Sequence, residues 1–166
     1  RLAVLKQRGD IKGDISGWAI LVDQGELGFV NPTIIDSEIN VRNGQLTSSG
    51  NLTFQFCKLS VEDGGIISNS GRNLTLDKQT SLLIKRGGTV ARRDVTLIKG
   101  AKIILAGGIF KALRFYMNAT TFTIDGGQLN TADVSIINGG YVNFTNDSKG
   151  IWTITSKKFD FKSLLK

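Results

Sequence analysis

Basic side chains are the residues of this sequence that are concentrated enough to do chemistry. Two adjacent basic pairs and four single Lys or Arg residues fall between positions 85 and 114, where Asp94 is the only acidic residue. Guanidinium and ammonium groups bind carboxylate, sulfate and phosphate oxygens, so this segment favours an acidic partner. The formal net charge of +7 extends the same preference to the whole chain.

We therefore predict an anion-binding surface made of basic residues that a repeat brings together. Its predicted members are Arg72, Lys85, Arg86, Arg92, Arg93, Lys111 and Arg114. Arg72, Arg93 and Arg114 each precede an apolar triplet, so we expect them to form a rough ladder. Stacked like charges repel unless an anion or a partner offsets them. The alternative interpretation is a solvated, charged corner that keeps the protein soluble.

The residues around the cations narrow the class of partner. No aromatic residues interleave with the cations to stack bases, and no nucleic-acid-binding motif occurs, so nucleic acid is not the expected partner. An anionic glycan, the phosphates of lipopolysaccharide and an acidic protein surface remain. No apolar run approaches the about 20 residues that a membrane-spanning helix needs.

Residue types that usually carry catalysis are scarce. The sequence has no His and one Cys, which removes the usual general base and any intrachain disulfide. Polysaccharide-cleaving enzymes need two carboxylates about 5–10 Å apart. Asp63 and Asp125 share a column of the repeat but lie three coils apart, or about 14 Å. We therefore expect no enzymatic activity, no cofactor and no metal, with a polysaccharide-degrading β-helix as the weaker alternative, and we expect Cys57 to fill the core.

These residues are positioned by a repeat of short apolar–polar–apolar triplets. One series begins at Leu52, Leu74, Val95, Phe115, Val134 and Trp152, in steps of 22, 21, 20, 19 and 18 residues. A second series begins at Ile39, Leu59, Leu82, Ile103, Phe122 and Val142. Glycine-containing turns follow its first five members, and these turns are followed by Leu46, Ile67, Val90, Phe110 and Leu129. Each repeat therefore offers three short strands in about 20 residues.

The repeat predicts an all-β fold. Alternation within each triplet indicates half-buried strands, and no segment has a helical period of useful length. Near-constant spacing favours a parallel β-solenoid (β-helix) of about six coils, because one coil cannot bury its own apolar face. The predicted organisation is a non-repeat N-terminal arm or cap over residues 1–37, the solenoid over 38–154, and a C-terminal cap or tail over 155–166.

One pair of outward positions indicates association between chains. Leu83 and Ile104 occupy the middle of their triplets in successive repeats, where other repeats carry Asn, Ser or Thr. Adjacent apolar residues on an outward face are more typical of an interface than of bare surface. We therefore expect Leu83 and Ile104 to contribute to a homo-oligomer.

Two stretches of the sequence resemble known surface proteins. Residues 61–67 (VEDGGII) and 73–76 (NLTL), with their recurrences over residues 39–154, resemble the β-helical shafts of bacterial adhesins and phage fibres. Residues 5–9 (LKQRG), Trp18 and residues 25–29 (GELGF) are similar to a segment near the start of phage tail-fibre and related virion proteins.

The resemblance implies a role outside the cell. It implies a non-enzymatic structural or attachment protein of a virion surface (a fibre, a spike or a capsid-decorating protein), a homotrimer in contact with other virion proteins. The alternative is a secreted bacterial adhesin or extracellular matrix module, with matrix proteins as partners. In either case, the expectation is a rigid rod that presents basic residues to an anionic partner.

Overall fold

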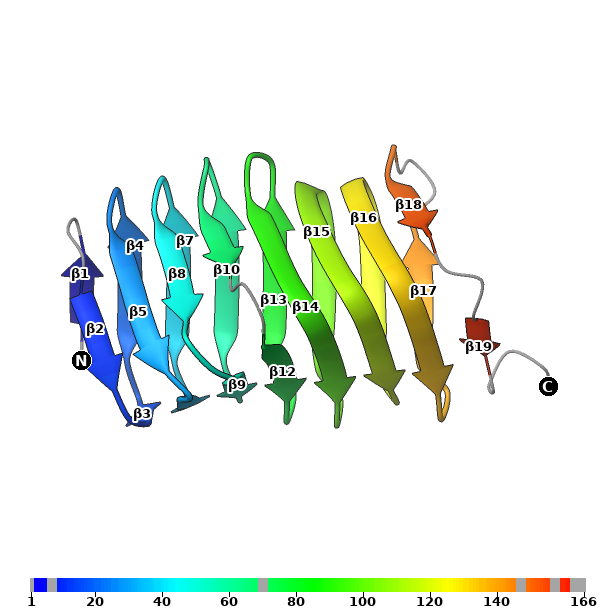
Figure 1. Cartoon of the computed structure of the whole chain (residues 1–166). Coiled ribbons are helices and arrows are strands. Elements are labelled where there is room, and N and C mark those ends of the chain that lie inside the picture. Colours follow the sequence, from blue (N-terminus) through cyan, green and yellow to red (C-terminus); the bar gives the residue numbers. More distant parts are fainter. Residues whose placement is uncertain (1, 6–8, 69–71, 146–148, 156–158, 162–166) are drawn as a thin grey trace.

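The computed structural model of the chain is a rod of stacked β-coils (Figure 1). It describes residues 2–5, 9–68, 72–145, 149–155 and 159–161, and the side chains of residues 9–68, 72–145 and 149–155. These residues form 19 strands and no helix, and neighbouring coils pair in parallel. The chain makes about seven turns of about 20 residues, so the predicted parallel β-solenoid is confirmed with about one more coil than expected.

Each coil contributes strands to three faces, which we call A, B and C. Face A contains β1 (Leu2–Leu5), β4 (Ala19–Asp23), β7 (Glu38–Arg42), β10 (Lys58–Glu62), β13 (Ser81–Lys85) and β17 (Tyr141–Phe144). Face B contains β2 (Gly9–Lys12), β5 (Glu26–Val30), β8 (Gln45–Ser48), β11 (Ile66–Ser68) and β18 (Ile151–Ile154). Face C contains β3 (Ile15–Ser16), β6 (Thr33–Ile35), β9 (Leu52–Gln55), β12 (Asn73–Asp77) and β19 (Phe159–Phe161).

Three long strands bend from one face to the next. β14 (Thr89–Ile98) continues from face B to face C, and β15 (Lys102–Asn118) and β16 (Thr121–Ile137) run through all three faces. The bend between faces B and C in these strands contains no glycine. Side chains at this bend therefore remain available to form a site.

Equivalent residues of successive coils stack in columns. On face C, Leu52 pairs with Leu74, Leu74 with Val95, and Val95 with Phe115. All four side chains are at most 1% exposed, so the predicted inward column of face C is confirmed. Such stacking lets every coil bury the apolar surface of its neighbours, which a single coil could not do.

The interior beneath the long strands is filled by aromatic rings from all three faces. Phe110 on face B, Phe115 on face C and Phe122 on face A meet edge to face, with ring centroids 5.4–5.6 Å apart. This geometry is favourable for aromatic pairs, and close packing holds the surrounding backbone in place. Cys57 is 1% exposed, and burial raises the pKa of its thiol, so its expected place in the core is confirmed.

The expected non-repeat arm over residues 1–37 is wrong. Strands β1–β6 belong to the same stack, with Ile20 in register with Ile39 and Leu27 in register with Leu46. The corner between β4 and β5 contains Gln24, which adopts a positive φ of 62° in place of a glycine. The first coils lack the Gly-Gly turns on which the repeat prediction depends, so the prediction missed them although their spacing is the same as that of the other coils.

The end of the predicted repeat also needs correction. The triplet series predicts that Trp152 follows Val134 in the face C column, but Trp152 pairs with Leu129 on face B. Residues 145–150 separate β17 from β18, so this strand begins later in the chain than a Gly-Gly turn would place it. The predicted C-terminal cap contributes β19, which pairs with β16. The rest of that segment, residues 156–158 and 162–166, lies outside the described residues.

Candidate anion-binding groove

A groove follows the bend between faces B and C over three successive coils. It is lined by residues 91–93 of β14, 111–113 of β15 and 130–132 of β16, with Thr155, and is an open depression of about 530 Å³. The register brings these segments together, because Arg92 pairs with Ala112 and Ala112 pairs with Thr131.

Arg92 is the unusual residue of this groove. It is 4% exposed, and its three guanidinium nitrogens are buried and have no hydrogen-bond partner among the described residues. Alternation along β14 places Arg92 on the same side as the core residue Val90, so its side chain points inward. The small side chain of Ala112 in the next coil leaves room for it.

Burial without a partner makes the charge of Arg92 costly. Desolvation lowers the pKa of its guanidinium to about 10, which still leaves it charged at neutral pH. An unpaired buried ion costs several kcal/mol, and a buried polar group without a partner calls for a specific explanation. An anion bound in the groove close to this guanidinium would offset part of that cost.

Other groove residues add charge and donors. Arg93 and Lys111 are exposed and line the same groove, and none of the described lining residues is acidic. Asn130 offers an amide donor at the rim. The Thr131 hydroxyl accepts a hydrogen bond from Trp152 Nε1 at 2.9 Å, which fixes its orientation. The groove therefore carries three cations and no counter-charge of its own.

Arg114 does not belong to this group. It donates hydrogen bonds to both carboxylate oxygens of Asp94 at 2.5 Å, and these bonds raise the pKa of Arg114. The register runs from Asp94 to Arg114 to Asp133, so charges alternate along this column. The predicted ladder of Arg72, Arg93 and Arg114 is therefore wrong at its last member.

The remaining predicted cations lie outside the groove. Lys85 donates a 2.6 Å hydrogen bond to Glu62, which lowers the pKa of that carboxyl. Arg86 and Arg72 are exposed, Arg86 at the corner after β13 and Arg72 just before β12. Of the seven predicted residues, the structure brings together Arg92, Arg93 and Lys111 in one groove.

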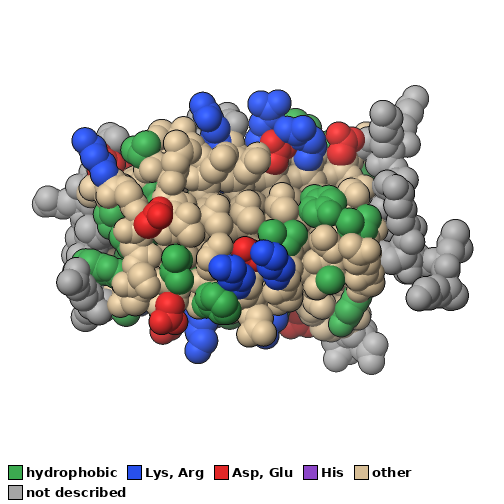
Figure 2. Space-filling model, turned by 90° about the horizontal axis from the view of Figure 1, so that it is seen from below, with side chains coloured by type: hydrophobic (Ala, Val, Ile, Leu, Met, Phe, Trp, Pro, Cys, Tyr) green, Lys and Arg blue, Asp and Glu red, His purple; other side chains and the backbone are tan. Residues whose placement is uncertain are grey.

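The charged surface is dispersed elsewhere. Figure 2 shows Lys and Arg side chains scattered over this face, some of them beside Asp or Glu side chains and some alone. Ion pairs such as Arg42 with Asp23 and Lys99 with Asp77 neutralise part of the charged surface. The groove differs from these surface pairs in that its cations have no acidic neighbour among the lining residues.

The predicted apolar pair is adjacent on face A. Leu83 is in register with Ile104, which is 37% exposed, while Ser60 and Thr123 flank the pair in the same column. The adjacency is confirmed, and the proposed role of the two residues in an interface stays a prediction.

Searches against protein-family models, curated proteins and solved structures found no match to this chain. Within the described ranges, no group of three or more His, Cys, Asp or Glu side chains is arranged to hold a metal ion. Nor is any helix there long and apolar enough to cross a membrane. The groove geometry is therefore the basis for assigning a role.

Proposed function

We propose that this protein is a non-enzymatic attachment module that binds an anionic partner in the groove around Arg92. The observation that carries the proposal is the buried guanidinium of Arg92, for which the described part of the chain provides no hydrogen-bond partner. Arg93 and Lys111 would contact further anionic groups at the rim. An anionic glycan suits this arrangement, because carboxylate or sulfate groups repeat along its chain while its rings can cover Leu113 and the groove alanines.

The stiffness of the rod supports this role. The two strands that bear Lys111 and Asn130 pair with each other from residues 102–118 to 121–137, and the three phenylalanines pack beneath them. A site built on packed strands loses little conformational entropy when it binds, so more of the interaction energy appears as affinity.

The resemblance to phage fibres suggests where such a module would operate. On this proposal the chain is part of a virion surface, oligomeric through Leu83 and Ile104, and in contact with other virion proteins. A bacterial adhesin or matrix module of the same fold is the second candidate, and the groove would serve the same purpose there. Purified phage particles probed with antibody against this chain, compared with bacterial surface fractions, would separate the two origins.

The binding proposal is tested with heparin and alginate as probes of two anionic types, sulfated and carboxylated. The variant Arg93→Glu/Lys111→Glu reverses two groove charges, and Arg86→Glu/Lys102→Glu makes the same change in charge at exposed residues outside the groove. We expect the groove variant to lose at least about tenfold in affinity for one of the probes, while the control retains most of it.

Two results would refute this assignment. Equal loss of affinity in both double variants would mean that binding follows net charge alone. Unchanged affinity in the groove variant, with folding verified by circular dichroism, would place the anion site elsewhere.

A further inference from the structure

Phe56 is an exposed aromatic residue in a backbone conformation that aromatic residues rarely adopt. Phe56 is 54% exposed, and its φ is 55°. It lies at the corner between faces C and A, where each coil within residues 9–68 and 72–145 has a left-handed residue. Equivalent corners contain Gly17, Asp36, Lys99, Ala119 and Asn138, all with φ between 48° and 71°.

Folding alone does not account for an aromatic residue at this position. The corner requires a positive φ, which glycine, Asn and Asp tolerate best and which is an outlier for a bulky side chain. Phe56 also leaves much of its apolar surface in water. Residues in such conformations occur preferentially at functional sites, so the outlier calls for a functional explanation.

A hollow of about 350 Å³ lies beside Phe56 on the N-terminal side. Residues 17–19, residues 36–38, Phe56 and Lys58 line it. Trp18 contributes its partly buried indole, which packs against the core. Within the described part of the chain, no hydrogen bond or ion pair engages the carboxylates of Asp36 and Glu38. The hollow therefore combines aromatic surface with two unused acceptors.

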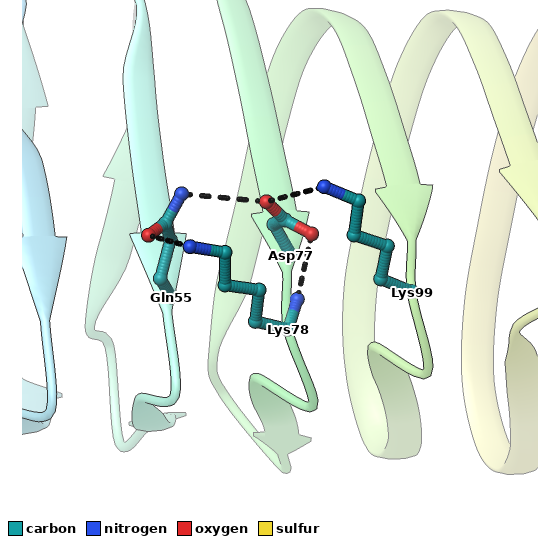
Figure 3. Close-up of polar contacts among 4 residues, drawn as sticks. All are labelled: Gln55, Asp77, Lys78 and Lys99. Atoms are coloured by element: carbon teal, nitrogen blue, oxygen red, sulfur yellow. Dashed lines mark hydrogen bonds and ion pairs between the residues drawn. The ribbon is translucent and has the colours of Figure 1, made fainter.

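On its C-terminal side, the Phe56 ring is contacted by Lys78 of the next coil. Lys78 Nζ lies 5.7 Å from the centroid of the Phe56 ring and donates a hydrogen bond to Gln55 Oε1 at 3.0 Å. Gln55 in turn donates to Asp77 Oδ2 at 3.3 Å, and Lys99 lies 4.0 Å from the same oxygen (Figure 3). This network holds Lys78 against the ring from the C-terminal side and leaves the hollow open on the other.

We propose that this hollow binds a neutral saccharide ring, stacked against Phe56 and hydrogen-bonded to Asp36 and Glu38. The apolar C–H face of a pyranose fits an aromatic ring, and its hydroxyl groups donate to carboxylates. Lys58 and Lys78 balance the two acids around the site, which disfavours a polyanion there. The site is therefore chemically distinct from the Arg92 groove and does not depend on the function proposed for it.

Saturation-transfer NMR with maltose and chitobiose tests the proposal. We expect signals from ring C–H protons with the wild type, with Phe56→Tyr and with the control Tyr141→Asn, which removes an exposed aromatic residue elsewhere. Phe56→Asn should lose the signal, while its melting temperature stays unchanged or rises, because Asn tolerates the left-handed corner. Heparin binding should stay unchanged in this variant, which separates the two sites.

Three results would overturn the proposal. One is the absence of a signal from either sugar with the wild type, and another is a wild-type signal with Phe56→Asn. The third applies if Phe56→Asn lowers the melting temperature, because a lost signal then no longer tests contact with the sugar. In that case the sugar affinity of the double variant Asp36→Asn/Glu38→Gln provides the test. A tenfold or greater loss of sugar affinity in that variant supports the site, and wild-type affinity refutes it.

Discussion

Arg92 lies in register with Ala112 of the next coil, and both side chains point into the interior of the solenoid. A large cation above a methyl group is an unusual pair in a solenoid whose buried side chains are mainly apolar. Ala112 provides the space, but nothing among the described residues provides a hydrogen-bond acceptor. Burying the charge of Arg92 therefore lowers the free energy of unfolding, and a bound anion would reduce this loss.

Replacing Arg92 by Met should stabilise the anion-free protein. The substitution removes an unpaired buried charge and keeps most of the side-chain volume, a change that often stabilises by about 1–4 kcal/mol. Urea unfolding in chloride buffer measures the difference, with Arg93→Met at the exposed neighbouring position as the control. A loss of about 3 kcal/mol or more in Arg92→Met would show that the guanidinium has a stabilising partner.

The pH dependence of that difference follows from the direction of the pKa shift. Burial lowers the pKa of Arg92 from its ordinary, higher value to about 10 in the folded state. The unfolded chain therefore binds more protons between these two values, and the wild type gains stability relative to Arg92→Met as pH rises through them. Below pH 10 the full deficit is present, and it shrinks as the pH rises above 10.

Matched unfolding curves of the two proteins at pH 8 and at pH 11 measure this change. Comparing the difference between the proteins cancels the titration of lysines and tyrosines that they share. A difference that is constant across this range would mean that Arg92 titrates as it does in the unfolded chain.

Phe115 should be essential to the stack. Its ring contacts Phe110 and Phe122 from two other faces, so Phe115→Ala would leave a cavity that the strands on three sides cannot close. We expect a loss of about 3–5 kcal/mol in the free energy of unfolding. Chemical denaturation measures it, with Tyr116→Ala on the outward side of the same strand as the control. Equal losses in the two variants would contradict the assignment of inner and outer positions.

The apolar pair on face A predicts self-association. Leu83→Ser/Ile104→Ser should convert a trimer into monomers without loss of strand content, because both side chains point outward between polar neighbours. Light scattering after gel filtration gives the mass of each protein. A wild type that is monomeric at all concentrations, or a variant that stays trimeric, would remove these residues from the interface.

The sequence predicted the columns well because the triplet spacing is nearly constant. It failed where spacing alone does not determine register. Arg72 and Arg93 are 21 residues apart, matching the step from Leu74 to Val95, but Arg114 follows Arg93 by 21 residues where the local step is 20. That single residue places Arg114 beside Asp94 and breaks the expected ladder.

Part of the site could be predicted from the alternation of inward and outward side chains along β14. Arg92 has the same parity as Val90, which predicts an inward side chain, but a charged residue is ordinarily expected to face water. The unpaired state of its guanidinium depends on the neighbouring coils and could not be read from the chain. The same holds for the hollow beside Phe56, because its walls come from three successive coils.

The most direct test of an anion site at Arg92 is the NMR signal of its own Nε–Hε group. The resonance is assigned by its absence from Arg92→Lys, and sulfate is then titrated at constant ionic strength against chloride. We predict a saturable shift of the Arg92 signal with sulfate, with smaller changes at Arg42, which is paired with Asp23. An Arg92 signal that does not move while the exposed arginines shift would contradict the account.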